Sequence, residues 1–464
     1  MVELLLLVGL AGAAEPQGWR FDGSGAWPTA DAPDAWSRTE HVAWRTELGG
    51  WSNASPVVAG DLVCACVEPV TLVCLDRATG VERWRATHPI AEAVPEAQRA
   101  DVQARIAELD ALDAELASKR AAYSAMLRDA RRGGADLTAR VDALATELDA
   151  LKARIAAVPD FRTPPDQGMV GWSSPTPVTD GRSLYVLYAN GVVAAHEHDG
   201  TLRWSRWLGR PPELMLGWDE GHAASPVLAG DVLVVPMGHL HGLDPRTGAS
   251  LWEGESWPHY GAATPAVVDG VPLVLTPSGR AYRAKDGVVL REGMAEMWYV
   301  APVVRDRDVW FLEARADDIL RKQHGADLVA WHLDGVQGDR LQATERWRVR
   351  VPETETFYAA PVPAGDVLHL VSHEGRLWTV EAASGAILGS LLLDAIRPTA
   401  LYASPAVAAG HLYVTSERGQ TAVLRAGRTP EVVAVNLLEN MRASPAFADG
   451  RLYFRTELAL VAVE

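Results

Sequence analysis

Short apolar runs recur through most of the chain, and turn-forming residues separate them. The segment 56–84 is representative: one run starts at Pro56, a second follows Asp61, and a third leads into a turn from Asp76 to Gly80. Runs of this length between Asp and Gly turns are typical of buried β-strands. The pattern therefore predicts a mainly β protein built from short strands that follow one another along the chain.

A small residue, a proline and a few apolar residues mark the first strand of each of eight repeats. After one gap of 121 residues, successive prolines lie 37 to 59 residues apart, which is near the period of a four-stranded propeller blade. Eight copies predict eight blades. The prolines are Pro56, Pro177, Pro226, Pro265, Pro302, Pro361, Pro405 and Pro445.

Tryptophan is unusually frequent, with 17 copies against 10 Tyr and 6 Phe, and several copies follow the repeat. Trp84, Trp204 and Trp252 each stand four residues after the glycine of a third-strand turn, and Trp347 holds the same place after a longer turn. The repeats near 287 and 385 lack this Trp. A bulky side chain at one repeated position predicts packing between neighbouring blades.

The two ends of the chain together supply the four strands of the last predicted blade. The last repeat supplies only three strands, within 445–463, and the segment His41–Leu48 supplies an unpaired strand whose Trp44 matches the repeated Trp. Pairing the two would leave no sheet edge open at the junction. We therefore predict an all-β, eight-bladed β-propeller with four-stranded blades, closed by its N- and C-terminal strands.

The proline-containing first strands, the LDxxTGxxxW turns and this closure resemble the quinoprotein-type, or PQQ-like, β-propeller repeat family. That superfamily includes BamB-like and quinoprotein dehydrogenase-like members, and the resemblance covers nearly all of 36–464 outside one insertion. It implies the propeller fold. It leaves function open, because the superfamily holds both dehydrogenases and non-catalytic scaffolds.

The insertion occupies 89–160 and divides the propeller into 36–88 and 161–464. It is rich in Ala, Glu, Leu and Arg, and Gly133-Gly134 interrupts it. Apolar residues of its second half recur in a 4-3 heptad pattern, which predicts an inserted antiparallel α-helical coiled-coil hairpin. The seam consists of Leu137, Val141, Leu144, Leu148, Leu151 and Ile155.

Residues 1–14 contain a short apolar core followed by small residues, which resembles a secretory signal peptide. No later stretch has the length and hydropathy of a transmembrane helix. The net charge of −17 disfavours nucleic-acid binding. We expect an exported, soluble protein of the periplasm or the extracellular space.

The three cysteines, Cys64, Cys66 and Cys74, lie on two predicted strands, and Cys64 and Cys66 point to the same face. An exported protein could form one disulfide and leave one thiol over. We expect instead that all three are buried thiols that pack as small apolar residues.

Loops cluster on one face of the predicted ring, because fourth-to-first and second-to-third connections open on the same side. The insertion, the segment Ser205–His222 and the segment Glu313–Ala326 all lie there. Residues just before each first strand would ring the channel mouth on this face, where they stack a planar ligand, a sugar or a side chain, or else pack blade against blade. They are Trp51, Trp172, His222, Tyr260, Trp298, Tyr299, Phe357, Tyr358, Tyr402, Asn440 and Arg442.

Resemblance to quinone-binding relatives implies a vicinal cysteine pair, acidic and amide calcium ligands and a catalytic Asp. No two cysteines are adjacent here, and no motif links the oxygen ligands Asp219, Glu220 and Asn440. The histidine pairs at 196/198 and 239/241 lack a third ligand at suitable spacing. We assign no catalytic residue and no metal site, and neither PQQ nor calcium is supported by a motif.

We therefore expect a non-catalytic, exported propeller that acts as a protein-binding or cell-envelope scaffold, as the resemblance to outer-membrane assembly propellers implies. The partner would bind the decorated face or the helical hairpin. The alternative is a PQQ-dependent dehydrogenase, or a propeller that binds a small ligand or carbohydrate at its aromatic mouth.

Overall fold

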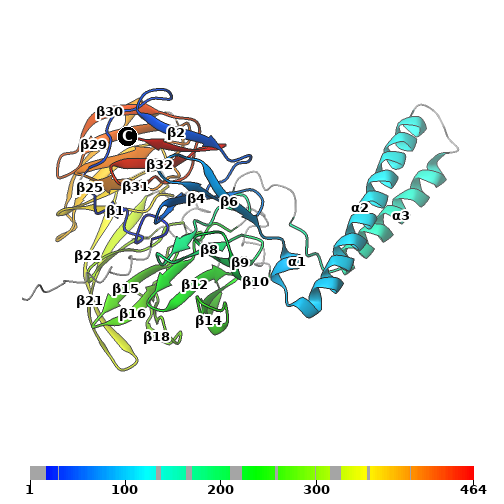
Figure 1. The fold of residues 1–464 in the computed structure, drawn as a ribbon, viewed down its shortest axis with the longest axis horizontal. Helices are drawn as coiled ribbons and strands as arrows, with labels where there is room; N and C mark the ends of the chain where they lie inside the picture. The colour runs from blue at the N-terminus through cyan, green and yellow to red at the C-terminus, as the bar shows by residue number, and fades with distance from the viewer. Residues whose placement is uncertain are drawn as a thin grey trace, which may run out of the picture. The chain divides into compact units, whose positions relative to one another are not determined.

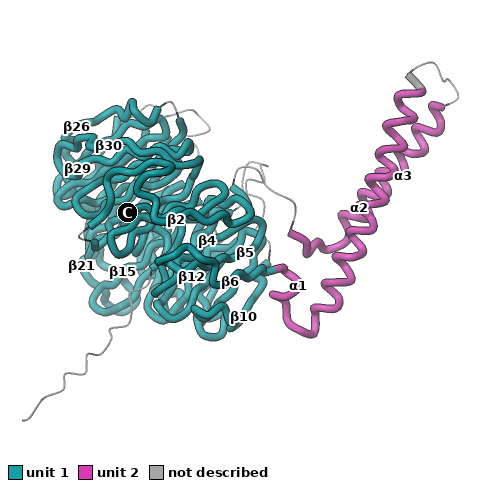
Figure 2. Tube along the Cα trace, turned by 45° about the horizontal axis from the view of Figure 1, so that its top comes forward, with its two compact units in different colours: residues 1–88, 165–464 teal, residues 89–164 magenta. Residues whose placement is uncertain are grey.

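The structure is a computed structural model that describes residues 17–29, 31–131, 137–163, 170–209, 222–256, 260–297, 299–313, 325–352, 356–397 and 399–464. The chain divides into two compact units (Figure 2). The first comprises Met1–His88 with Pro165–Glu464, and the second comprises Pro89–Pro164.

The first unit is a ring of eight sheets (Figure 1), so the predicted eight-bladed propeller with four-stranded blades is confirmed. Each blade is antiparallel, with the first strand innermost and the fourth outermost. Blade 1 contains β3 (Val57–Ala59), β4 (Leu62–Val67), β5 (Thr71–Asp76) and β6 (Glu82–Thr87). Blade 2 contains β7 (Val178–Thr179), β8 (Ser183–Leu187), β9 (Val192–Glu197) and β10 (Leu202–Trp207). Blade 3 contains β11 (Val227–Ala229), β12 (Val232–Met237), β13 (His239–Leu243) and β14 (Ser250–Ser256).

The following blades continue the same order around the ring. Blade 4 contains β15 (Thr264–Val268), β16 (Val271–Leu275), β17 (Ala281–Arg283) and β18 (Val289–Arg291). Blade 5 contains β19 (Val303–Arg305), β20 (Asp308–Glu313), β21 (Ala326–Gln337) and β22 (Arg340–Val351). Blade 6 contains β23 (Val362–Ala364), β24 (Val367–Val371), β25 (Arg376–Glu381) and β26 (Ile387–Leu392), followed by the 3-10 turn η2 (Asp394–Ile396).

The last two blades use strands from both ends of the chain. Blade 7 contains β27 (Ala406–Ala408), β28 (His411–Thr415), β29 (Gln420–Arg425) and β30 (Glu431–Leu437). Blade 8 contains β31 (Ala446–Ala448), β32 (Arg451–Arg455), β33 (Ala459–Val463) and β2 (Val42–Glu47). Strand β2 pairs antiparallel with the C-terminal strand β33, which confirms the predicted closure.

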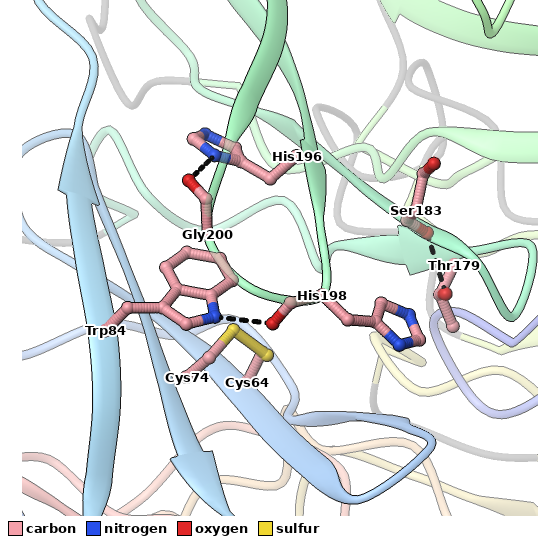
Figure 3. Close-up of a disulfide and its surroundings, with 8 residues drawn as sticks. All are labelled: Cys64, Cys74, Trp84, Thr179, Ser183, His196, His198 and Gly200. Atoms are coloured by element: carbon pink, nitrogen blue, oxygen red, sulfur yellow. Dashed lines mark hydrogen bonds between the residues drawn. A yellow bond between two sulfur atoms is a disulfide. The ribbon is translucent and has the colours of Figure 1, made fainter.

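The repeated tryptophans join five of the blades to the next blade at the rim of the ring. The indole nitrogen of Trp84 donates to the carbonyl of His198 in the turn of blade 2, at 2.8 Å (Figure 3). A glycine of the same turn, Gly200, lies beneath the ring, where an added Cβ would stand 2.8 Å from the Trp84 Cγ atom. Trp44, Trp204, Trp252 and Trp347 dock in the same way on Arg77, Pro245, Ala284 and Ala382.

Hydroxyls that precede the repeated prolines join the blades on the channel side. The Ser55 amide donates to the Thr176 hydroxyl, and the Thr176 amide donates to the Ser225 hydroxyl. The Ser444 amide of the last blade donates in turn to the Ser55 hydroxyl at 3.0 Å. Buried backbone donors need such partners, so a Ser or Thr before the proline locks neighbouring first strands together.

The N-terminal segment 17–29 enters the channel, which the sequence patterns did not predict, because we started the propeller at 36. Strand β1 (Ala26–Trp27) adds to blade 7 by parallel pairing with β27, and Gln17 pairs with Thr179 of blade 2. The segment therefore spans the channel between two blades that lie far apart along the ring.

The second unit is a helical hairpin. It contains α1 (Ile90–Ala93), α2 (Glu96–Arg131) and α3 (Thr138–Ala157). Leu112, Leu116, Leu148 and Leu151 form a buried cluster between α2 and α3. Lys119 pairs with Glu147 at 2.6 Å, which is consistent with an antiparallel arrangement. The predicted break at Gly133-Gly134 lies outside the described residues.

The cysteine expectation is wrong for two of the three residues. Cys64 and Cys74 stand directly opposite each other on β4 and β5, and they form a disulfide (Figure 3). Cys66 remains a free, buried thiol, and burial raises its pKa. The register between β4 and β5 decides which cysteine faces Cys74, and the strand pattern alone did not fix that register.

The Trp–Gly contact predicts a difference between two glycine substitutions. Gly200→Ala and Gly270→Ala both place a side chain at positive φ, which costs about 1–2 kcal/mol. An added Cβ at Gly200 also meets Trp84, whereas one at Gly270 meets nothing within 4 Å. We expect Gly200→Ala to lower the free energy of unfolding by roughly 1–3 kcal/mol more than Gly270→Ala, in urea titrations. Equal losses would show that the Trp84 contact contributes little.

Candidate binding site at the channel mouth

Five of the residues predicted to ring the mouth come together around one cavity of about 210 Å³. They stand at the starts of consecutive blades, because each follows a fourth-to-first connection and precedes a first strand. Their side chains are half-buried. These residues, which we call the mouth cluster, are Tyr260, Tyr299, Tyr358, Tyr402 and Arg442.

The tyrosines of the mouth cluster form a continuous chain of ring contacts. Tyr260 stacks on Tyr299 with centroids 5.4 Å apart, and Tyr299 meets Tyr358 edge to face at 4.8 Å. Tyr358 also contacts Tyr402 at 5.7 Å. His373, from the second-to-third connection of blade 6, packs against Tyr358 and Tyr402 at 4.9 and 5.1 Å. Edge-to-face and stacked pairs hold rings in fixed orientations, so the cluster is preorganised.

Arg442 stands at the end of this series of ring contacts, and it also lines a neighbouring hollow. Its guanidinium lies 4.9 Å from the Tyr402 ring centroid and pairs with Glu417 at 3.6 Å. The neighbouring hollow, of about 470 Å³, is polar and shares Arg442 with the cavity. Trp51 and Asn440, which the sequence also placed at the mouth, line this hollow together with Glu417, Arg418 and Glu457.

Three predicted mouth residues point into the protein instead. Trp172 is 5% exposed, and Phe357 and His222 are each 1% exposed. Phe357 belongs to the core beneath the mouth, and the His222 imidazole is hydrogen-bonded to the Pro236 carbonyl. Phe357 and Tyr358 are adjacent in sequence, so successive side chains point to opposite sides and only Tyr358 reaches the mouth. Trp298 lies outside the described residues, as do most of 205–222 and 313–326.

The floor of the cavity comes from the N-terminal segment, which sequence reasoning missed. Trp19 lines the cavity, and the guanidinium of Arg20 lies 5.3 Å from the Trp19 ring centroid. Arg20 is only 2% exposed, and its Nη2 atom donates to the carbonyls of Pro361 at 2.8 Å and Pro405 at 3.1 Å. The concentration of Trp, Phe and Gly in 18–27 was the available signal, but it matched no blade repeat.

Arg20 holds the segment at a high electrostatic cost. Burial lowers the pKa of its guanidinium to about 9, so the group is still charged at neutral pH. Its Nε and Nη1 atoms have no hydrogen-bond partner among the described residues. A buried cation is stabilised only by the groups that surround it. The two proline carbonyls, from blades 6 and 7, stabilise the Arg20 guanidinium by accepting its hydrogen bonds.

The segment also separates the mouth from the other end of the channel. A hollow of about 840 Å³ lies on the opposite side of Trp19, and the mainly apolar residues of β11, β15 and β19 line it. Trp19 belongs to the linings of both spaces. The mouth is therefore a basin whose floor Trp19 closes.

The histidine pairs noted in the sequence are parts of the blades. His196 lies between blades 1 and 2, with its Nε2 atom 2.7 Å from that of His88 (Figure 3 shows His196 and His198). His241 is hydrogen-bonded to the Met237 carbonyl at 3.0 Å. Within the described ranges, no three side chains of His, Cys, Asp or Glu gather as metal ligands. Asp219 and Glu220 fall outside those ranges.

A family model described as outer membrane protein assembly factor BamB matches residues 160–391, which is half of the chain. The chain belongs to this family of PQQ-like propellers. The predicted family is therefore confirmed. A search of curated proteins finds no match.

Two solved structures illustrate the likeness of this PQQ-like propeller to others. BamB from Moraxella catarrhalis superimposes with a TM-score of 0.54 at 13% identity, over 91% of this chain and 100% of that chain. A europium-containing methanol dehydrogenase gives a TM-score of 0.49 at 11% identity, over 96% and 89%. At these identities the likeness shows the fold alone. Among the described helices, none combines the length and apolar composition needed to cross a membrane.

The residues at the mouth do not fit a quinone with its calcium ion. The cavity is smaller than the roughly 300–1,000 Å³ of ordinary small-molecule sites. No carboxylate and no cysteine occurs among its described lining residues. Glu417 and Glu457 line the neighbouring hollow instead, and Glu417 faces Arg442. Hard cations favour carboxylate oxygens among their ligands, and the described lining residues of the cavity supply only neutral oxygens.

This misfit predicts the outcome of a quinone titration. Trp19 and Trp51 lie at the mouth, so a quinone stacked there would quench their fluorescence. We expect no saturable quenching when pyrroloquinoline quinone is added to about 100 μM, with or without calcium. Saturable quenching that requires calcium would contradict this assignment.

Proposed function

We propose that the chain is a non-catalytic scaffold of the cell envelope that binds a protein partner through the mouth of its propeller. The observation that carries the proposal is the mouth cluster: four preorganised tyrosines and Arg442 around a basin that the N-terminal segment closes. Tyr and Arg are the residue types that contribute most binding energy at protein interfaces. A basin of about 210 Å³ is below the volume of ordinary small-molecule sites and would accept an inserted side chain.

The surroundings of the mouth cluster support the same proposal. The adjoining hollow carries both signs of charge, from Glu417, Glu457 and Arg418. An aromatic centre with a charged margin is the usual anatomy of a protein interface. Membership of a family described by an outer-membrane assembly factor is consistent with a scaffold role.

The disulfide supports export. Cys64–Cys74 is buried within blade 1, and disulfides persist in oxidising compartments such as the periplasm and the extracellular space. An envelope location accords with the signal-like residues 1–14. Both the location and the partner belong to the proposal.

Cysteine alkylation tests the export component. In protein recovered from the producing cells and unfolded under alkylating conditions, we expect one label per chain, on Cys66. After reduction we expect a label on each of the three cysteines. Mass spectrometry of the labelled peptides distinguishes the two states. Three labels without prior reduction would mean that the protein resides in a reducing compartment.

Site-specific photocrosslinking tests the mouth as the docking surface. A photoreactive amino acid at Tyr299 in the full chain should yield a discrete protein adduct in the producing cells. The same probe at Val267, which is 62% exposed and lines the opposite end of the channel, serves as the matched control. We expect adduct yield at Tyr299 to fall at least about tenfold when Tyr358 and Tyr402 are changed to Ala, because hot-spot truncation costs 2 kcal/mol or more.

The controls keep the result interpretable. Circular dichroism and thermal unfolding should show that Tyr358→Ala with Tyr402→Ala retains the propeller, since both side chains are half-buried at the surface. Equal adducts from Tyr299 and Val267, or an adduct that survives the double substitution, would overturn the assignment of the mouth.

A further inference from the structure

The outer strand of blade 7 differs from the outer strands of the other blades. In the described chain, β10, β14 and β18 each expose one large apolar side chain, and β2, β6, β22 and β26 expose none. Strand β30 exposes four: Val432 at 44%, Val433 at 41%, Val435 at 44% and Leu437 at 41%. Its sequence EVVAVNL has one charged residue and no proline.

Strand β30 carries few of the devices that normally protect a sheet edge. Charged residues, prolines and covering segments prevent edge strands from pairing with other chains. The pairing of β30 with β29 has an irregular step at Val433, and each of the other outer strands has a comparable step. Beyond Val433, residues Ala434–Leu437 pair regularly with β29. The docking Trp that five other blades carry is absent here, as it is from β18 and β26. Beyond Val433 the edge is therefore regular, apolar and open.

The N-terminal chain covers only one side of this strand. The Trp36 amide donates to Oδ1 of Asn436 at 2.9 Å, and Nδ2 of Asn436 donates to the Asp34 carbonyl at 2.9 Å. Arg38 donates to the Leu438 carbonyl just past the end of β30. These contacts bury Asn436, whereas Val435 and Leu437, which point to the other face, stay exposed.

We infer that β30 is a self-association edge, where two copies of this chain pair their β30 strands antiparallel about a two-fold axis. Such pairing would join two four-stranded blades into one continuous sheet and would bury Val435 and Leu437 of both copies. Main-chain hydrogen bonds supply affinity in strand addition of this kind.

Charge complementarity selects a second copy as the occupant. In an antiparallel pair, the start of one strand meets the end of the other, so Glu431 of one copy lies beside Arg38 of the second. Arg38 forms no ion pair with any described residue, and Glu431 is exposed and pairs only with the exposed Arg425. A two-fold axis makes the Glu431–Arg38 contact twice. No like charges face each other along the strand.

Sedimentation velocity of the full chain tests the inference. We expect a reversible dimer of two 50.0 kDa chains between about 1 and 100 μM. Val435→Lys combined with Leu437→Lys should raise the dimer dissociation constant at least about 100-fold, since lysines on an edge oppose strand pairing. The matched control is Leu202→Lys with Leu251→Lys, on outer strands with similar exposure of 48% and 49%, which should leave the dimer intact.

A charge exchange tests the antiparallel arrangement itself. Arg38→Glu alone and Glu431→Arg alone should each weaken the dimer about tenfold, and the double exchange should restore it. Thermal unfolding of each variant confirms that the propeller is intact. A monomeric wild-type chain at about 100 μM, or a dimer that the lysines on β30 leave unchanged, would overturn the inference.

Discussion

The docking of an outer-strand Trp on the turn of the next blade, made by five of the eight blades in the described chain, is the contact on which the ring depends. An indole nitrogen donates to a turn carbonyl, and the indole ring lies on a glycine that has no Cβ to obstruct it. Each blade is too small to bury its own faces, so neighbouring blades must do so. The Ser and Thr hydroxyls before the repeated prolines provide the same connection on the channel side. Closure by β2 and β33 extends both sets of contacts to the last blade, where Trp44 docks on blade 1.

The ring of blades surrounds a central channel, and the N-terminal segment 17–29 occupies part of it. Strand β1 and Gln17 extend blades 7 and 2 into the channel, and Arg20 bonds to blades 6 and 7. The segment turns a passage into a closed basin with Trp19 at its floor. The surface of the mouth then consists of half-buried rings that pack against one another, and the proposed binding of a partner's side chain rests on this arrangement.

Positions that depart from the repeat pattern lie on surfaces that make no blade-to-blade contact required for the fold. The positions that keep Trp, Gly and the hydroxyls carry blade-to-blade contacts; the hydroxyls are buried, and most of the docking tryptophans are half-buried. Blades 4, 6 and 7 lack the docking Trp, and of these three only blade 7 exposes several large apolar side chains on its described outer strand. The mouth cluster likewise occupies the residue before each first strand, a position that the repeat leaves free. Conformity to the repeat therefore serves stability, and variation within it is available for binding.

The sequence by itself determined the blade count, the closure, the Trp contacts and the helical insertion, because each rests on a local pattern repeated at a regular period. It also placed five residues at the channel mouth, because their position in the repeat precedes a first strand. They are Tyr260, Tyr299, Tyr358, Tyr402 and Arg442. Only the tertiary structure decided that Phe357 and Trp172 point inward, since one residue of offset reverses the direction of a side chain. Strand register alone set Cys64 opposite Cys74. The placement of Arg20 between blades 6 and 7 depends on contacts across more than 340 residues, which no local pattern encodes.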